Sequence, residues 1–500
     1  MGVLSDLEPR KVFYYFEELT KIPHGSGNVG RISDYLVAFA KEHGLEVIQD
    51  AVKNVIIFKD ATAGYEQEPA LILQGHMDMV AVKKPDCDIN MRTEGLRVAV
   101  EGDRVYAEGT SLGGDDGIAV AYGLAVLDSK ELQHPRLEVI FTVDEETGMD
   151  GARAIDVSML KGNRLLNLDS EGEGIFLTSC AGGARVKCRL PMERSETEGF
   201  VCELTIGGLL GGHSGEEIHK ERGNSNSLFG RVLWSLAEKM PIQLVSVQGG
   251  LADNAIARET KAELLIPSQS ELGERIAGEP YNSNEFDECL EDLMMEIADE
   301  LAVKDPGFQM SWKRDNKRQQ ALAVTVEDTK RAAAFLHVCP NGVQGMSADI
   351  GGLVETSLNL GILSFAEQSD GAWALTADFA VRSSVESAKK ALIAKLVALT
   401  KLTGGFCEVT GDYPGWKYRA DSPLREKMIR VYREMYGTDP KVEAIHAGLE
   451  CGILGSKIKD LDCVAIGPDM KDIHTTEETL SISSTRRVWE YLVKLLAAKD

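Results

Sequence analysis

The sequence contains no apolar run long enough to cross a membrane. Its longest apolar stretches, such as residues 391–399, are interrupted by charged residues such as Lys395, and they fall well short of the roughly 20 residues that a bilayer requires. Residues 1–18 mix charged and apolar side chains and lack the basic-then-apolar pattern of a secretory signal. We therefore expect no membrane partner.

The sequence also lacks any regular arrangement of cysteines. Its nine cysteines form no CxxC pair, and an odd number cannot all pair within one chain. This excludes a small disulfide scaffold and argues against a zinc site built on thiolates. We interpret the cysteines as reduced and mostly buried side chains, which predicts a cytoplasmic location.

Basic side chains are in the minority. The 54 lysines and arginines are outnumbered by 79 aspartates and glutamates, which gives a formal net charge of −25. This excess repels a phosphate backbone, so we expect no nucleic-acid partner. With 500 residues, 43% of them apolar, the chain predicts a globular protein of about two to four domains.

The order of apolar patterns predicts an α/β domain interrupted by an insertion. In residues 1–186 strands alternate with helices, which favours a mostly parallel central sheet. Residues 187–404 read as an inserted α+β domain, and residues 405–500 return to the first pattern. We expect helices at residues 8–45 (two, around a turn at 24–28), 118–127, 228–240, 286–301, 387–400, 424–436 and 484–498. We expect strands at residues 55–58, 70–73, 96–100, 137–143, 164–168, 187–190, 201–206, 372–381, 441–446 and 463–466.

A histidine and an aspartate lie shortly after the predicted strand at residues 70–73. His76 and Asp78 are two residues apart, so in a strand they point to the same face. A metal-bound imidazole oriented by a carboxylate requires this arrangement. The alternative is a polar strand end without a ligand role.

Acidic residues also cluster in two other places. Asp115 and Asp116 lie between glycines just before an apolar helix, where they suit either helix capping or a carboxylate shared by two cations. Asp144, Glu145 and Glu146 directly follow an apolar strand, at the end where open α/β sheets place their sites. Like charges this close repel unless a cation neutralises them, although a solvated loop remains an alternative.

Two further candidates complete the set. Asp169 ends the strand predicted at residues 164–168, and His474 precedes the final helix. Asp169 fits a helix-capping or loop role equally well. The alternative for His474 is a structural role, which is more common for an isolated histidine. Taken together, imidazoles and carboxylates without cysteine are the ligands of a catalytic zinc or manganese site, and a shared carboxylate holds two such ions about 3.5–4 Å apart.

The order of these motifs resembles the M20 metallopeptidase family, and within it the aminoacyl-histidine dipeptidases. The resemblance covers essentially the whole chain, including Ile22-Pro23-His24 and the segment from His446 to Gly452. It implies a catalytic zinc-peptidase domain, an inserted lid domain, a small peptide substrate and a homodimer formed through the lid.

The resemblance also implies a role for each candidate residue. One zinc ion is expected on His76, Asp115 and Asp169. The second is expected on Asp115, Glu146 and His474, with Asp115 bridging and with Co²⁺ or Mn²⁺ as alternative metals. Asp78 is expected to orient His76, Glu145 to act as general base, and the Asp115–Asp116 peptide bond to be cis. In the lid, His213 is expected to reach the scissile carbonyl, and Asn254 and Arg382 resemble the family's binders of substrate carboxylate and carbonyl groups.

These implications predict a di-zinc dipeptidase that hydrolyses short peptides of the Xaa-His type. The alternative enzymes are other M20 amidohydrolases: a tripeptidase, an N-acyl-amino-acid deacylase or a carbamoyl hydrolase. A non-catalytic binding protein is the alternative outside the enzymes, and the presence of Glu145 beside a full ligand set argues against it.

Overall fold

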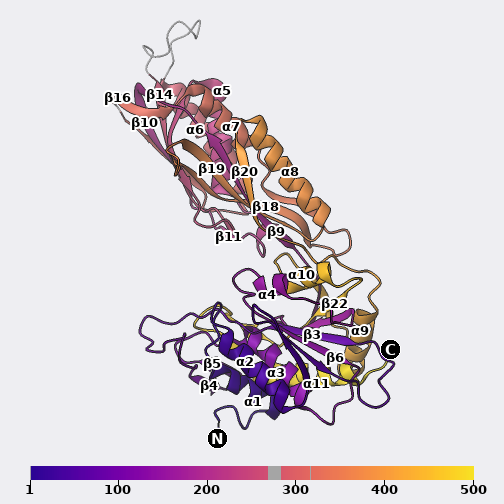
Figure 1. Cartoon of the computed structure of the whole chain (residues 1–500). Helices are drawn as coiled ribbons and strands as arrows, with labels where there is room; N and C mark the ends of the chain where they lie inside the picture. The colour runs from indigo at the N-terminus through magenta and orange to yellow at the C-terminus, as the bar shows by residue number, and fades with distance from the viewer. Residues whose placement is uncertain (1, 268–282, 316) are drawn as a thin grey trace. The chain divides into compact units, whose positions relative to one another are not determined.

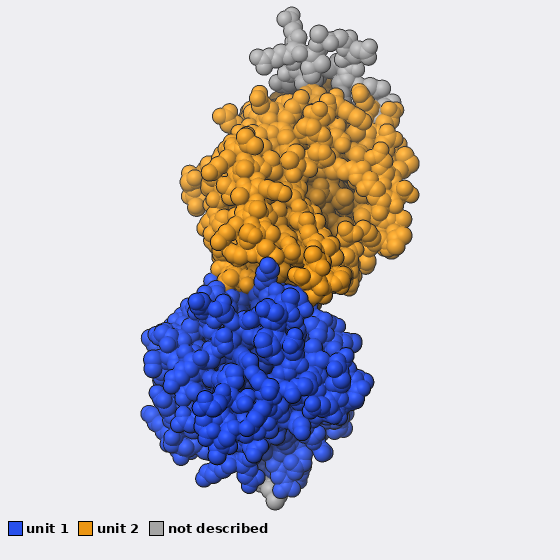
Figure 2. Space-filling model, turned by 90° about the vertical axis from the view of Figure 1, so that its right-hand side faces the viewer, with its two compact units in different colours: residues 1–180, 416–444, 449–500 blue, residues 181–415, 445–448 orange. Residues whose placement is uncertain are grey.

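The computed structural model describes residues 2–267, 283–315 and 317–500 (Figure 1). The chain divides into two compact units, coloured separately in Figure 2. Unit 1 comprises residues 1–180, 416–444 and 449–500, and unit 2 comprises residues 181–415 and 445–448. No helix among the described residues has both the length and the apolar character needed to span a membrane.

Unit 1 is built around an eight-stranded sheet in the order β1-β2-β6-β3-β7-β22-β8-β21. Its central strands β6, β3, β7 and β22 run parallel, whereas β1, β2 and β8 join it by antiparallel pairing. The predicted parallel centre of the sheet is confirmed, and antiparallel strands extend it on both sides. The strands are β1 (Glu46–Gln49), β2 (Val55–Lys59), β3 (Leu71–His76), β6 (Leu137–Thr142), β7 (Arg164–Asn167), β8 (Ile175–Cys180), β21 (Lys441–Ile445) and β22 (Asp462–Ala465).

Helices cover both faces of this sheet. A Cβ atom on Gly75 would lie 2.5 Å from Cβ of Ala119 in helix α3, whereas the preceding side chain, Gln74, bonds to Glu450 of helix α10. Neighbouring strand residues point to opposite faces, so α3 and α10 lie on opposite sides of β3. The helices are α1 (Arg10–Thr20), α2 (Gly30–Glu42), α3 (Gly114–Asp128), α4 (Asp150–Ala154), α9 (Pro423–Tyr436), α10 (Glu450–Lys457) and α11 (Ile482–Ala497).

The apolar residues that predicted these helices form the core of unit 1. Phe13 and Phe16 of α1 are fully buried, as are Ile32 and Leu36 of α2 and most of α3. Because α3 is apolar on all sides, it is buried between α1 and the sheet. A small second sheet in the order β23-β24-β5-β4 completes the unit. Its strands are β4 (Val98–Glu101), β5 (Arg104–Ala107), β23 (Met470–Lys471) and β24 (Thr479–Ser481).

Unit 2 contains a larger sheet whose strands pair antiparallel. Its main order is β15-β10-β14-β12-β18-β19-β9-β20, with β16 beside β10 and β17 beside β18. A separate pair, β11 and β13, lies outside it. The strands are β9 (Gly182–Pro191), β10 (Arg194–Gly207), β11 (Gly212–His213), β12 (Gln243–Gly249), β13 (Ala255–Ile256), β14 (Thr260–Pro267), β15 (Gln309–Arg314), β16 (Gln319–Val324), β17 (Gly342–Met346), β18 (Val354–Glu367), β19 (Trp373–Ser383) and β20 (Phe406–Tyr413).

Helices α5 (Ser225–Lys239), α6 (Ser283–Leu301), α7 (Val326–Val338) and α8 (Glu386–Leu402) accompany this sheet, and α8 packs on β9 and β19. The limits of unit 2 differ from the predicted insertion, residues 187–404. Residues 405–415 stay with unit 2 because β20 pairs with β9. The glycine turn before β20 resembled a domain boundary but connects α8 to a strand of the same unit.

Candidate metal centre

The candidate residues of unit 1 lie at one edge of its central sheet. The parallel strands β6, β3 and β7 end side by side, with His76 opposite Thr142 in register. His76 is the last residue of β3, Glu145 and Glu146 follow β6, and Asp169 follows β7. Parallel pairing therefore brings together motifs that are far apart in the sequence.

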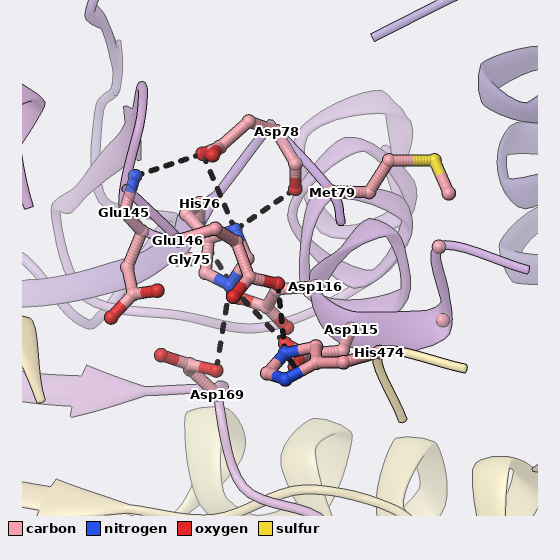
Figure 3. Close-up of polar contacts among 12 residues, drawn as sticks. Gly75, His76, Asp78, Met79, Asp115, Asp116, Glu145, Glu146, Asp169 and His474 are labelled. Carbon is pink, nitrogen blue, oxygen red and sulfur yellow. Dashed lines mark hydrogen bonds and ion pairs between the residues drawn. The ribbon is translucent and has the colours of Figure 1, made fainter. Parts of the chain in front are cut away.

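Asp115 lies between the two imidazoles (Figure 3). Its Oδ1 is 3.2 Å from Nε2 of His76, and its Oδ2 is 3.1 Å from Nε2 of His474. The Asp115–Asp116 peptide bond is cis, as the resemblance implied. Each oxygen of one buried carboxylate thus faces a different histidine, which is the geometry of a carboxylate that two cations share.

Each imidazole also faces a second carboxylate. Nε2 of His76 is 3.7 Å from Oδ1 of Asp169, and Nε2 of His474 is 3.0 Å from Oε1 of Glu146. The Glu146 oxygen is buried and, despite this short distance, has no hydrogen bond of acceptable geometry. Atoms with lone pairs that face one another in this way are suited to a common positive ion.

Charge supports the same interpretation. Among the described residues, no lysine or arginine forms an ion pair with the carboxylates of this cluster, and their ionic partners there are the two histidines. Burial and the neighbouring carboxylates raise the pKa of Asp169 and of Asp116 well above the usual range. Divalent cations would remove this repulsion, so the donor set fits metal ions.

Within the described part of the chain, two groups that share His76 have ligand atoms close enough to hold an ion: His76 with Asp116 and Asp169, and His76 with Asp115 and Glu146. Asp116 is a member that the sequence argument did not assign. Its Oδ2 accepts a hydrogen bond of 3.1 Å from the backbone N–H of His76, and its Oδ1 is buried without a partner. A Cβ atom on Gly75 would lie 2.6 Å from that Oδ2, so glycine is needed for this close approach.

Asp78 contacts His76 somewhat differently from the prediction. Strand β3 ends at His76, so Asp78 lies beyond it. Nδ1 of His76 is 3.0 Å from the main-chain carbonyl of Asp78 and 3.5 Å from its carboxylate. The carboxylate instead accepts hydrogen bonds from the Ser26 hydroxyl (2.8 Å) and from the backbone N–H of Glu145 (3.1 Å). Asp78 therefore links His76 to the segment that carries Glu145.

The electrostatic surroundings of Glu145 and His474 favour the protonated form of both. Burial, with Glu450 and Glu146 nearby, raises the pKa of Glu145 to about 8. Contacts with Asp115 and Glu146 raise the pKa of His474 to about 10. Without added positive charge, the cluster therefore retains protons at neutral pH.

Glu478 holds the loop that presents Asp115, a role the sequence argument missed. Its buried carboxylate accepts backbone hydrogen bonds from Leu112 (2.7 Å), Gly113 (3.0 Å), Gly114 (2.8 Å) and Asp115 (3.3 Å). These partners lie more than 360 positions away in the sequence, so no local pattern could reveal them.

The sequence argument also did not identify a buried network of polar side chains on the strands that carry the cluster. Glu450 accepts hydrogen bonds from Gln74 (2.6 Å) and Thr142 (2.5 Å), and Asn167 donates to Gln74 (2.7 Å). Burial raises the pKa of Glu450 to about 7. The network connects β3, β6 and β7 at positions two to four residues before the candidate ligands, and it stabilises their spacing.

The three candidate residues of the insertion lie in unit 2. His213 is paired with Ala255 across strands β11 and β13, and the main-chain carbonyl of Asn254 accepts a hydrogen bond of 2.8 Å from Ser214. A Cβ atom on Gly215 would lie 3.0 Å from the His213 ring and 3.3 Å from Cζ of Arg382. Because Gly215 has no side chain, the guanidinium of Arg382 and the imidazole of His213 can both lie next to it.

Two observations mark this part of unit 2 as suited to an anion. Nε of Arg382 is buried without a hydrogen-bond partner, and among the described residues Arg382 forms no ion pair. His446, to which the sequence argument gave no role, lies beside Gly215, and its Nε2 is 2.7 Å from the Ser357 hydroxyl. Burial, followed by the nearby Arg382 charge, lowers the pKa of His446 to about 3.

Comparison with known proteins agrees with this geometry. The chain is 35% identical over 498 residues to the cytosol non-specific dipeptidase of Escherichia coli K12, with 99% of each chain covered. Its structure is similar to that of aminoacylhistidine dipeptidase from Vibrio alginolyticus (35% identity, TM-score 0.90, 99% and 98% of the two chains). The aminopeptidase PepT of Bacillus cereus shares the fold at 17% identity (TM-score 0.59, 98% of each chain). The model of peptidase family M20/M25/M40 matches residues 72–498, and the chain therefore belongs to this family of peptide-bond hydrolases.

Proposed function

We propose that the protein is a dinuclear metallo-dipeptidase that holds two zinc ions and cleaves short peptides, with Xaa-His dipeptides as its preferred class. The observation that carries the proposal is the position of Asp115, whose two carboxylate oxygens face His76 and His474 at 3.2 and 3.1 Å. The names of the two relatives at 35% identity, a non-specific dipeptidase and an aminoacylhistidine dipeptidase, support the choice of substrate.

The proposed ligand sets follow the contacts around each imidazole. His76, Asp115 and Asp169 would hold one zinc ion, and Asp115, Glu146 and His474 the other, with Co²⁺ or Mn²⁺ as alternatives. Bound there, the two ions supply Lewis acidity, which makes water a stronger nucleophile and a peptide carbonyl a better electrophile.

Glu145 is the proposed general base. It is held next to the cluster by its backbone hydrogen bond to Asp78, and its side chain lies among the candidate ligands in Figure 3. In this role Glu145 accepts a proton from the attacking water and returns it to the leaving amine. Bound cations would lower its pKa from about 8, so the carboxylate would be ionised and able to accept that proton at neutral pH.

Unit 2 would bind the end of the substrate. The unpaired guanidinium of Arg382 suits a terminal carboxylate in a bidentate pair, which would restrict substrates to short peptides with a free carboxyl end. Asn254 would donate a side-chain hydrogen bond to the substrate, and His213 would stabilise the negative oxygen that forms on the attacked carbonyl. We further propose a homodimer formed through unit 2, and a cytoplasmic location in keeping with the name of the Escherichia coli relative.

Replacement of Glu145 tests this mechanism. Glu145→Ala leaves all five proposed ligands in place, so the variant is expected to bind two zinc ions per chain by elemental analysis. Its kcat on Xaa-His dipeptides is expected to fall by about 10²–10⁴-fold, the usual contribution of a general base. Near-wild-type turnover would remove Glu145 as the base, and a panel of tripeptides and N-acyl amino acids would reveal one of the alternative M20 activities.

A further inference from the structure

Two cysteine side chains meet on neighbouring strands of unit 2. Cys188 of β9 and Cys407 of β20 are direct partners in an antiparallel pair, and their sulfur atoms are 3.1 Å apart. Directly opposed residues of an antiparallel pair have Cα atoms about 4.5–5.5 Å apart, which lies within the range that a disulfide bridges. The sulfur atoms need to approach by roughly 1 Å to reach a bond length of about 2.05 Å.

The two thiols differ in access and in acidity. Cys188 is fully buried, whereas Cys407 is partly exposed on β20, the edge strand of the sheet. The hydrogen bond between them lowers the pKa of Cys407, and the same contact together with burial raises the pKa of Cys188. A partly exposed cysteine of lowered pKa beside a second thiol is the arrangement of a cysteine that reacts with oxidants.

We propose that Cys188 and Cys407 form an oxidation site that reacts with hydroperoxides and closes to a disulfide. The Cys407 thiolate attacks the O–O bond of the peroxide, so that an S–O bond forms, the O–O bond breaks, and hydroxide leaves and is protonated to water. The Cys188 thiol then attacks the Cys407 sulfenic sulfur, so that the S–S bond forms and the S–O bond breaks. A second water leaves with the Cys188 proton. Overall, two thiols lose two electrons and one hydrogen peroxide is reduced to two waters.

The cross-link has a structural consequence. It joins positions 219 residues apart and fixes the edge strand β20 to its neighbour. Because a long closed loop restricts the unfolded chain, the oxidised protein is expected to unfold at a higher temperature than the reduced protein. The site shares no residue with the candidate metal centre, so its test is independent of the proposed function.

The experiment treats the full-length, zinc-loaded protein with hydrogen peroxide at one to a few molar equivalents. After catalase is added, the protein is denatured in an alkylating reagent and analysed by intact mass and by peptide mapping. We expect two thiols per chain to escape alkylation, a Cys188–Cys407 cross-linked peptide, and full reversal by dithiothreitol. A disulfide that involves Cys339, or Cys407 oxidised to sulfinic acid without a cross-link, or no oxidation of Cys407 at all, would overturn the proposal.

The chain supplies matched controls. Cys339 is the third thiol near this pair, so Cys339→Ser is expected to keep the cross-link, while Cys188→Ser, which keeps a hydrogen-bond donor beside Cys407, is expected to accumulate a Cys407 sulfenic acid that dimedone labels. Cys451 and Cys463 also contact each other, but both are buried in unit 1. That pair is expected to remain fully alkylatable, and its oxidation at the same rate would contradict a selective site. Peptide mapping of the wild-type protein decides the question even if a variant fails to fold.

Discussion

Glu478→Gln is the substitution that tests most sharply how the fold positions Asp115. The wild-type carboxylate is buried and accepts four backbone N–H groups, two at each oxygen. Glutamine has the same shape but offers one acceptor, so its NH₂ group must face two of the four N–H donors. Two hydrogen bonds to a charged group are therefore lost, and two buried donors are left without partners.

The size of the effect follows from those two bonds. Hydrogen bonds to charged groups contribute about 1.5–3 kcal/mol each, which predicts a loss of about 3–6 kcal/mol from this loop. The loop relaxes and moves Asp115, so we expect zinc affinity and kcat/KM to fall by about 10–100-fold, as is usual when support of a metal ligand is removed.

The neighbouring residue provides the control. Glu477 is exposed and pairs with Lys84 at the surface, so Glu477→Gln is expected to leave both stability and activity nearly unchanged. The assays are urea denaturation of the metal-free protein, zinc titration against a competing chelator, and dipeptide hydrolysis. If Glu478→Gln retains zinc affinity and kcat/KM within twofold of the Glu477→Gln values, the carboxylate does not position Asp115 and the reasoning fails.

Two other predictions concern protons and the substrate carboxylate. Since the pKa of His474 is raised to about 10 in the metal-free protein, the stability it contributes is present below its unfolded pKa of about 6.5 and is lost as pH rises to about 10. Zinc must therefore displace a proton from His474 when it binds at pH 7. We expect calorimetric titration with zinc to show this proton release as a binding heat that depends on the ionisation enthalpy of the buffer. A binding heat that is the same in all buffers would contradict the prediction. Arg382→Lys keeps the positive charge but loses the two-pronged fork, so KM for dipeptides is expected to rise at least tenfold with a smaller change in kcat, and an unchanged KM would exclude the proposed clamp.

The sequence pattern indicates the candidate ligands, but it does not indicate the side chains that support them. His76 is the last residue of an apolar strand and Asp169 closely follows another, and both features can be recognised in the sequence. Neighbouring parallel strands end at the same edge of a sheet, so these two residues are expected to lie close together. The support of Asp115 by Glu478 depends on hydrogen bonds between segments that are distant in the chain. No periodicity or spacing encodes that contact, so only the folded structure reveals it.

The errors in the predicted fold have a similar origin. The antiparallel pairing of β2 with β6 was not foreseen, because an apolar strand has the same composition whichever direction its neighbour runs. The boundary expected at residue 404 was misplaced because a glycine turn looks alike between two domains and within one. Residues 405–415 return to β9, and only strand pairing decides to which unit they belong.

The most direct measurement of the proposed centre is the anomalous scattering of the zinc-loaded protein in a crystal. We expect two zinc peaks per chain, about 3.5–4 Å apart, one bonded to each carboxylate oxygen of Asp115. A single peak, or two peaks of which only one contacts Asp115, would contradict a shared carboxylate and with it the dinuclear mechanism.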